Sequence, residues 1–269
     1  MRSGSSPFYY RAWEAENPKA NIIGVHGFAE HSARYGEMAD FMVSRGYSFY
    51  MYDLRGHGRT AIGDNKGYIS NFSDFVDDTH DFANRIIHDG GHANTVIYGH
   101  SMGGLIVLDY LSRHGSDVCC AITSGPATKM EANAFTKFLL VMMNALSPRS
   151  RIKLPIKPEN LTHVKEIYEA YVNDPLVLKN PTVKLVYELY SGSRSIWNRM
   201  ENITTPILML HGSEDRVVPV TATLDAYERI KSSDKQKKIY QGMYHEIHNE
   251  VNRHEVLDDI SEWIRDHVV

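Results

Sequence analysis

The chain has 269 residues, of which 42% are hydrophobic and 23% are charged. This is ordinary globular composition, and the length suits one large domain or one domain with an insertion. The net charge of −4 argues against a nucleic-acid-binding protein, which would carry a basic surface. Because the two cysteines, Cys119 and Cys120, are adjacent, no disulfide framework is expected.

The N-terminal residues 1–20 contain no apolar core typical of a signal peptide. No segment reaches the roughly 18 consecutive apolar residues that a membrane-spanning helix requires. We therefore expect a cytoplasmic protein, with peripheral membrane association as the most that the sequence allows.

Short apolar segments alternate with longer helical patterns along most of the chain. Between the apolar segments, hydrophobic residues recur at helical spacing, for example from Phe75 to Ile87 and from Leu105 to Leu111. This alternation predicts an α/β fold with a mostly parallel sheet covered by helices on both faces. The predicted strands are residues 21–26, 47–52, 95–99, 118–123, 206–210 and 238–240.

The strand pattern stops between about residues 126 and 202. Residues 134–146 are predicted to form a helix that is apolar on most of its circumference, and a second helix is predicted at 161–172. The simplest domain organisation is an α/β core formed by residues 1–125 and 203–269, with a helical cap inserted at residues 126–202.

A G-x-S-x-G motif occupies residues 99–103, where a predicted strand ends and a helix begins. A sharp strand-to-helix turn exposes the central serine, and small flanking residues let the neighbouring backbones pass closely. The five-residue pattern alone is common by chance. Its position between a strand and a helix favours Ser101 as a catalytic nucleophile over a glycine-rich turn.

A serine nucleophile needs an orienting acid and a histidine base, which follow it in that order in this architecture. Asp215 follows the strand at 206–210 and is the predicted acid. Its neighbour Glu214 is interpreted as a solvated loop charge, and Asp53, after an earlier strand, as part of a structural turn. His245 follows the strand at 238–240 through a short loop and is the predicted base.

Three further histidines follow His245. His254 and His267 belong to the last helical pattern and are expected at the surface, whereas His248 is expected where this helix begins. The spacing of His245 and His248 is one residue short of the zinc-binding H-E-x-x-H pattern. We therefore expect neither a metal nor an organic cofactor in the reaction.

Acyl transfer also requires hydrogen-bond donors for the oxyanion that forms. The backbone N–H after the nucleophile belongs to Met102, and the loop after the first predicted strand supplies the N–H of Phe28. Both are predicted to form the oxyanion hole.

Together these segments resemble the α/β-hydrolase superfamily, specifically its monoacylglycerol lipase and lysophospholipase-like branch. Residues 26–35, HGFAEHSARY, are similar to its H-G-x-x-E-H-S-x-R-Y segment, and residues 244–250, YHEIHNE, to its H-E-x-x-N-E ending. Residues 53–58, 99–104 and 215–219 match in the same order. One departure is Phe28, where the branch often has a small residue.

The resemblance implies hydrolysis of a small lipid ester, such as a monoacylglycerol, that enters an acyl tunnel under a mobile cap. In this branch the positions of Glu30, Arg34 and His248 bind the glycerol hydroxyls. From the residues alone, Glu30 and Arg34 would instead form a surface ion pair of little energetic value. The helix at 134–146 is then expected to shelter the acyl chain and touch a lipid surface, with ordinary core packing as the alternative.

Other functions share this core fold. Lysophospholipases, short-chain carboxylesterases and serine peptidases are alternatives among enzymes, and a catalytically inactive small-molecule-binding protein is the alternative from another class. The sequence indicates neither the preferred acyl chain nor the oligomeric state.

Overall fold

A seven-stranded sheet forms the centre of the protein, with the strand order β1-β3-β2-β4-β5-β6-β7. The computed structural model describes residues 8–89, 94–130, 133–153 and 157–268. Strand β1 pairs antiparallel with β3, and all other neighbouring strands are parallel. The strands are β1 (Tyr10–Trp13), β2 (Ala20–Val25), β3 (Tyr47–Tyr52), β4 (Asn94–His100), β5 (Cys120–Ser124), β6 (Ile207–Gly212) and β7 (Lys235–Tyr240).

The burial of each strand follows its sequence. Strands β2, β5 and β6 are buried along their whole length, as expected for apolar strands of a parallel sheet with helices on both faces. The edge strand β7, KQKKIY, is mostly exposed or half-buried. Its lysines discourage pairing with another chain, and they explain why the sequence predicted only its last three residues as a strand.

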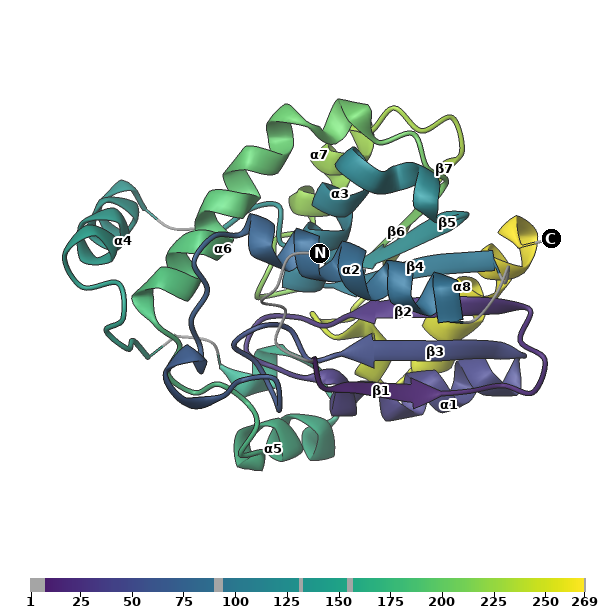
Figure 1. Ribbon diagram of the computed structural model, residues 1–269, viewed down its shortest axis with the longest axis horizontal. Coiled ribbons are helices and arrows are strands. Elements are labelled where there is room, and N and C mark those ends of the chain that lie inside the picture. Colours follow the sequence, from purple (N-terminus) through teal and green to yellow (C-terminus); the bar gives the residue numbers. More distant parts are fainter. Residues whose placement is uncertain (1–7, 90–93, 131–132, 154–156, 269) are drawn as a thin grey trace.

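Helices cover both faces of the sheet and form two apolar cores (Figure 1). One core lies under α2, α3 and α7, and the other lies under α1 and α8. These helices are α1 (Gly36–Ser44), α2 (Ser73–Asp89), α3 (Met102–His114), α7 (Thr221–Arg229) and α8 (Arg253–His267). The predicted α/β architecture is therefore confirmed.

Among the described residues between β5 and β6, three α-helices are found: α4 (Ala134–Leu146), α5 (Lys165–Asn173) and α6 (Val183–Ser195). Figure 1 shows α4 at the far end of the molecule, separated from the sheet by α6. The sequence did not predict α6, which places Leu185 and Leu189 in the core shared with α3. Within the described ranges, no helix is both long and apolar enough to cross a bilayer.

Two hydrogen bonds join the segment before α5 to the loop that carries His245. The backbone N–H of Glu246 donates to the carbonyl of Leu161 at 2.7 Å, and the Thr162 hydroxyl donates to the carbonyl of Asn249 at 2.9 Å. These bonds hold residues 161 and 162 outside a helix, so α5 begins at Lys165 rather than at the expected residue 161.

Candidate active site

Ser101 lies on a strained turn between β4 and α3. Its backbone φ is 54°, in the left-handed region that only a few non-glycine residues occupy. A Cβ atom at Gly99 would lie 2.4 Å from the carbonyl oxygen of Gly103, and one at Gly103 would lie 2.0 Å from that of Val25. The close approach of three backbones therefore requires both glycines and leaves the Ser101 side chain at the carboxyl end of the sheet.

The structure brings Ser101, His245 and Asp215 together from three separate loops. His245 Nε2 lies 2.9 Å from Ser101 Oγ, and His245 Nδ1 lies 2.6 Å from Asp215 Oδ2. Asp215 Oδ1 accepts hydrogen bonds from the N–H groups of Val217 and Val218. These backbone bonds fix the carboxylate so that its second oxygen faces the imidazole.

Electrostatics favour an ionised acid beside a basic imidazole. Burial opposes ionisation of Asp215, but the nearby charge of His245 and hydrogen bonds from His211 and His245 hold its pKa well below the usual range. For His245, burial alone would lower the pKa, but the Asp215 carboxylate outweighs it and raises the pKa, with Glu246 and Glu30 contributing. The site thus stabilises the imidazolium that proton transfer from serine would produce.

His211 is a neighbour of the acid that the sequence did not single out. It is fully buried at the end of β6, with Nε2 3.1 Å from Asp215 Oδ2 and Nδ1 2.7 Å from the Thr223 hydroxyl. The signal for it was its place at the carboxyl end of a strand, four residues before the predicted acid. The rival acid Asp53 accepts hydrogen bonds from Ser32 and Arg59, consistent with a structural turn.

The two predicted oxyanion donors lie on either side of the nucleophile turn. Met102 is the first residue of α3, so its N–H has no partner within the helix. Among the described residues, no acceptor is found for the N–H of Phe28 either. The preceding loop is shaped by His26, whose Nδ1 donates to the Gly27 carbonyl at 2.8 Å and whose Nε2 accepts from the Leu54 N–H.

Glu30 and Arg34 do not form a surface ion pair. Both side chains are less than 10% exposed, so this expectation from the residues alone is wrong. Arg34 also binds the buried carboxylate of Glu246 through both terminal nitrogens, each 2.8 Å from an oxygen. Tyr171 of α5 lies over the guanidinium, 4.9 Å from it.

Glu30 is held by several further donors. Its Oε1 atom accepts from the Gly27 N–H at 2.6 Å and from the Tyr35 hydroxyl at 2.7 Å. Burial raises the pKa of this carboxyl, but Arg34 and neighbouring histidines outweigh burial and hold the pKa well below its usual range. The group is therefore an anion at neutral pH.

His248 occupies a different environment from Glu30 and Arg34. Its ring stacks on Tyr35 with 4.9 Å between centroids and meets the edge of His100 at the same distance. Burial lowers its pKa to about 4, and neither ring nitrogen has a hydrogen-bond partner among the described residues. Unlike Glu30 and Arg34, His248 is not among the described residues that line the cavity.

A cavity of about 320 Å³ opens over Ser101 and His245. Its volume lies in the range of small-molecule sites, about 300–1,000 Å³. The core supplies charged groups, Glu30, Arg34 and Glu246, whereas the segment between β5 and β6 supplies mainly apolar ones. The latter include Met130, Leu161, Tyr171, Val186 and Leu189.

This mixed lining suits an amphipathic ligand. The apolar lining comes largely from the segment between β5 and β6, so this segment shapes the apolar part of the cavity.

Comparison with known proteins finds relatives that match nearly the whole chain. The chain is 30% identical over 272 residues to a monoacylglycerol lipase of Mycolicibacterium smegmatis, covering 98% of this chain and 95% of the relative. It is 26% identical to phospholipase YtpA of Bacillus subtilis, covering 91% of this chain and 95% of the relative.

A solved structure has the same fold. The crystal structure of Paleococcus ferrophilus monoacylglycerol lipase superposes with a TM-score of 0.86 at 24% identity, covering 97% of this chain and all of the other. The family model described as serine aminopeptidase, S33 (Hydrolase_4), matches residues 16–252. The chain thus belongs to the Hydrolase_4 family of α/β-hydrolases.

Proposed function

We propose that this protein hydrolyses carboxylic esters of lipids, most simply a monoacylglycerol to glycerol and a free fatty acid. One observation carries the proposal: the hydrogen-bonded series Ser101–His245–Asp215 opens into a cavity with a charged group of side chains and an apolar lining. A monoacylglycerol has a polar head and a long apolar chain, which match those two kinds of lining. The similarity to the Mycolicibacterium smegmatis monoacylglycerol lipase supports this substrate class.

The proposed reaction has two steps. His245 takes the Ser101 proton as the hydroxyl attacks the ester carbonyl, and Asp215 stabilises the imidazolium. The N–H groups of Phe28 and Met102 hold the oxyanion; loss of one such donor typically costs about 100- to 1,000-fold in kcat. His245 then protonates the departing glycerol oxygen. Water, deprotonated by His245, releases the fatty acid from Ser101 by the same steps, and no cofactor takes part.

We assign Glu30 and Arg34 to the glycerol head because both line the cavity beside Ser101. Their existing hydrogen bonds keep them in place, so a hydroxyl adds a contact rather than replacing one. His248 contacts His100, which lines the cavity, but does not itself line it. Its proposed contact with glycerol therefore requires a bridging water or a movement of the ring. His248→Ala should then reduce monoacylglycerol turnover while largely sparing a p-nitrophenyl ester; equal loss of both activities would indicate a packing role.

A lysophospholipid is the second candidate substrate. Arg216 and Lys129 line the cavity and offer positive charge to a phosphate group. Arg216 lies over the Tyr244 ring at 4.4 Å, whereas Lys129 already pairs with Asp225. A lysophospholipase would lose activity in an Arg216→Gln variant, whereas monoacylglycerol hydrolysis would change little.

We also propose that α4 contacts a lipid surface. Its exposed apolar side chains are Phe135, Phe138, Leu139, Val141, Met142 and Leu146, with Phe135 71% and Leu146 78% exposed. An apolar surface of this kind usually marks an interaction site.

The test of the catalytic proposal combines labelling with turnover. A fluorophosphonate probe should label the wild-type protein and fail to label Ser101→Ala or His245→Ala. A panel of monoacylglycerols, lysophospholipids and p-nitrophenyl esters of graded length then identifies the preferred ester. Retention of full esterase activity by Ser101→Ala would refute the mechanism, and a labelled protein that hydrolyses none of these esters would refute the substrate class.

A further inference from the structure

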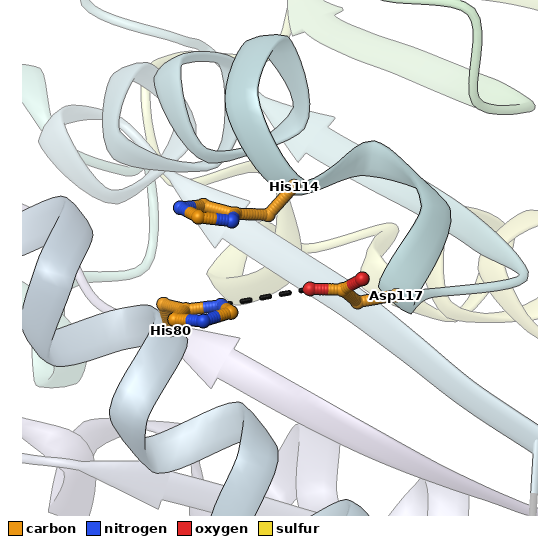
Figure 2. Close-up of side chains that lie close together, drawn as sticks. All are labelled: His80, His114 and Asp117. Carbon is orange, nitrogen blue, oxygen red and sulfur yellow. Dashed lines mark ion pairs between the residues drawn. The ribbon is translucent and has the colours of Figure 1, made fainter.

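Two histidines and an aspartate meet at the end of α3 that is remote from Ser101. His80 lies on α2, His114 is the last residue of α3, and Asp117 ends the short 3₁₀ helix η3 (Gly115–Asp117). One ligand atom of each residue lies within 4.8 Å of the other two. Figure 2 shows the two imidazole rings stacked face to face with the Asp117 carboxylate beside them.

We propose that His80, His114 and Asp117 bind a zinc ion. Imidazole and carboxylate are ligands that Zn²⁺ accepts, and a site with three protein ligands leaves its fourth position to water. Tetrahedral bonds of about 2.0–2.2 Å place ligand atoms about 3.3 Å apart. The widest separation of 4.8 Å must therefore shrink by about 1.5 Å. The two rings are also nearly parallel, with 3.9 Å between centroids and 17° between planes, so their in-plane lone pairs do not yet converge on one point. Zinc binding therefore requires rotation of the His80 and Asp117 side chains, which are 29% and 32% exposed, to unstack the rings and shorten the widest separation.

The surroundings of His80 fit a metal ligand. Its Nδ1 atom is buried without a hydrogen-bond partner among the described residues and lies 3.5 Å from Asp117 Oδ2, too far for a good hydrogen bond. Its Nε2 atom lies 3.0 Å from the side-chain amide of Asn84. A flip of that amide, which exchanges its nitrogen and oxygen, makes Asn84 accept the Nε2–H and frees the Nδ1 lone pair. Metal-binding histidines are normally oriented by such an acceptor.

Asp117 presents one carboxylate oxygen to the cluster. Asp117 Oδ1 accepts from the Ser116 hydroxyl at 3.2 Å, which leaves Oδ2 facing His80.

The position of the cluster predicts a structural role. Helix α3 spans 13 residues, about 20 Å at 1.5 Å per residue, from the nucleophile turn to His114. A bound ion would tie α2 to the end of α3 without reaching the cavity over Ser101. Zinc at this cluster should therefore raise the thermal stability and leave ester hydrolysis unchanged.

The test uses untagged protein stripped with EDTA and titrated with ZnCl₂ by calorimetry, with Co²⁺ visible absorption as a second readout. We expect one saturable site per chain, at least about tenfold weaker in His114→Asn and in Asp117→Asn. The matched control is His254→Asn on α8, an exposed histidine whose loss should change nothing. Since Asp117 is partly exposed, Asp117→Asn should fold even if His114→Asn does not.

Thermal melting provides an independent measurement. Zinc should raise the melting temperature of the wild type and of His254→Asn, and should not raise that of Asp117→Asn. Absence of saturable binding, or equal binding by all three variants, would overturn the proposal. Zinc binding that inhibits ester hydrolysis and persists in His114→Asn and Asp117→Asn would place the ion on the catalytic histidine instead and would also overturn it.

Discussion

Arg34 binds the carboxylate of Glu246, the residue next to His245, with two hydrogen bonds of 2.8 Å. Glu30 binds the Nη1 atom of the same guanidinium, which Glu246 also contacts, so two buried anions share one cation. The group therefore carries a net negative charge close to His245, whose pKa it helps to raise. The placement of His245 in the site and the basicity of its imidazole thus depend on a segment that lies more than 200 residues earlier in the sequence.

Glu246→Gln should move the acidic limb of the pH–rate profile. Removing the carboxylate lowers the His245 pKa, because Glu246 is one of the charges that raise it. The base then stays neutral to lower pH, so the acidic limb of kcat/KM should shift to lower pH. Glu262→Gln, an exposed acid on α8, is the control and should leave the limb in place. An unchanged limb in Glu246→Gln would contradict this electrostatic role.

His248→Phe should flatten the dependence of stability on pH. In the unfolded chain a histidine titrates near pH 6.5, whereas folded His248 has a pKa of about 4. The unfolded state therefore binds the extra proton first as the pH falls, and the free energy of unfolding decreases below pH 6.5. Between pH 7 and pH 5 this one group accounts for about 2 kcal/mol.

Urea denaturation at the two pH values measures this loss. Phenylalanine preserves the ring packing on Tyr35 but cannot titrate, so the variant should lose about 2 kcal/mol less than the wild type. An equal loss in both proteins would mean that folding does not lower the pKa of His248.

Gly103→Ala should prevent stable folding of the nucleophile turn. Its Cβ would lie 2.0 Å from the Val25 carbonyl oxygen, and backbone cannot move aside as a side chain can. We expect a loss of more than about 3 kcal/mol in the free energy of unfolding. Gly36→Ala is the matched control: Gly36 has helical φ, and no neighbouring atom would lie within 4 Å of the added methyl group.

Gly36→Ala should leave the stability unchanged or should stabilise the protein by up to about 1 kcal/mol, because alanine loses less conformational entropy on folding than glycine does. Comparable destabilisation of the two variants would contradict the steric explanation.

A protein with Phe138→Asp and Leu139→Asp should separate lipid contact from chemistry. The two side chains are 61% and 45% exposed, so their replacement should not alter stability. Burying each in a lipid surface is worth about 1.5–3 kcal/mol. The rate of hydrolysis of long-chain monoacylglycerol in vesicles should thus fall at least about tenfold. The rate of hydrolysis of p-nitrophenyl acetate should not change.

Val251→Asp, also at an exposed apolar residue but outside α4, is the control for this variant. Loss of activity on both substrates in the double variant would indicate a folding defect, and full activity on vesicles would refute the lipid contact.

The local sequence pattern was sufficient to predict the central strands of the sheet. Strands β2 to β6 are recognisable as short apolar runs because both of their faces are buried. Strand β1 escaped prediction because it has only four residues, YRAW, and alternates between exposed and half-buried. It exists as a strand through its antiparallel pairing with β3, which a local pattern does not reveal.

The candidate site was predictable where chain order and turn chemistry constrain it. The motif at 99–103 and the loops after β6 and β7 were enough to select Ser101, Asp215 and His245 as candidates, and the structure places them within hydrogen-bond distance. Sequence reasoning left Glu246 without a role, because its partner Arg34 is 212 residues away. Pairings of this kind depend on how the sheet brings distant loops together.

Two hydrogen bonds tie Leu161 and Thr162 to the loop that carries His245, so this part of the segment between β5 and β6 must move with the base. Leu161 also lines the cavity over Ser101, whereas no residue of α4 is among the described residues that line it. A chimaera that carries the α4 helix of a relative should therefore keep its rate of bond cleavage on soluble esters. Insertions near Leu161 should impair catalysis, so the surface of α4 can diverge in evolution without altering the chemistry at Ser101.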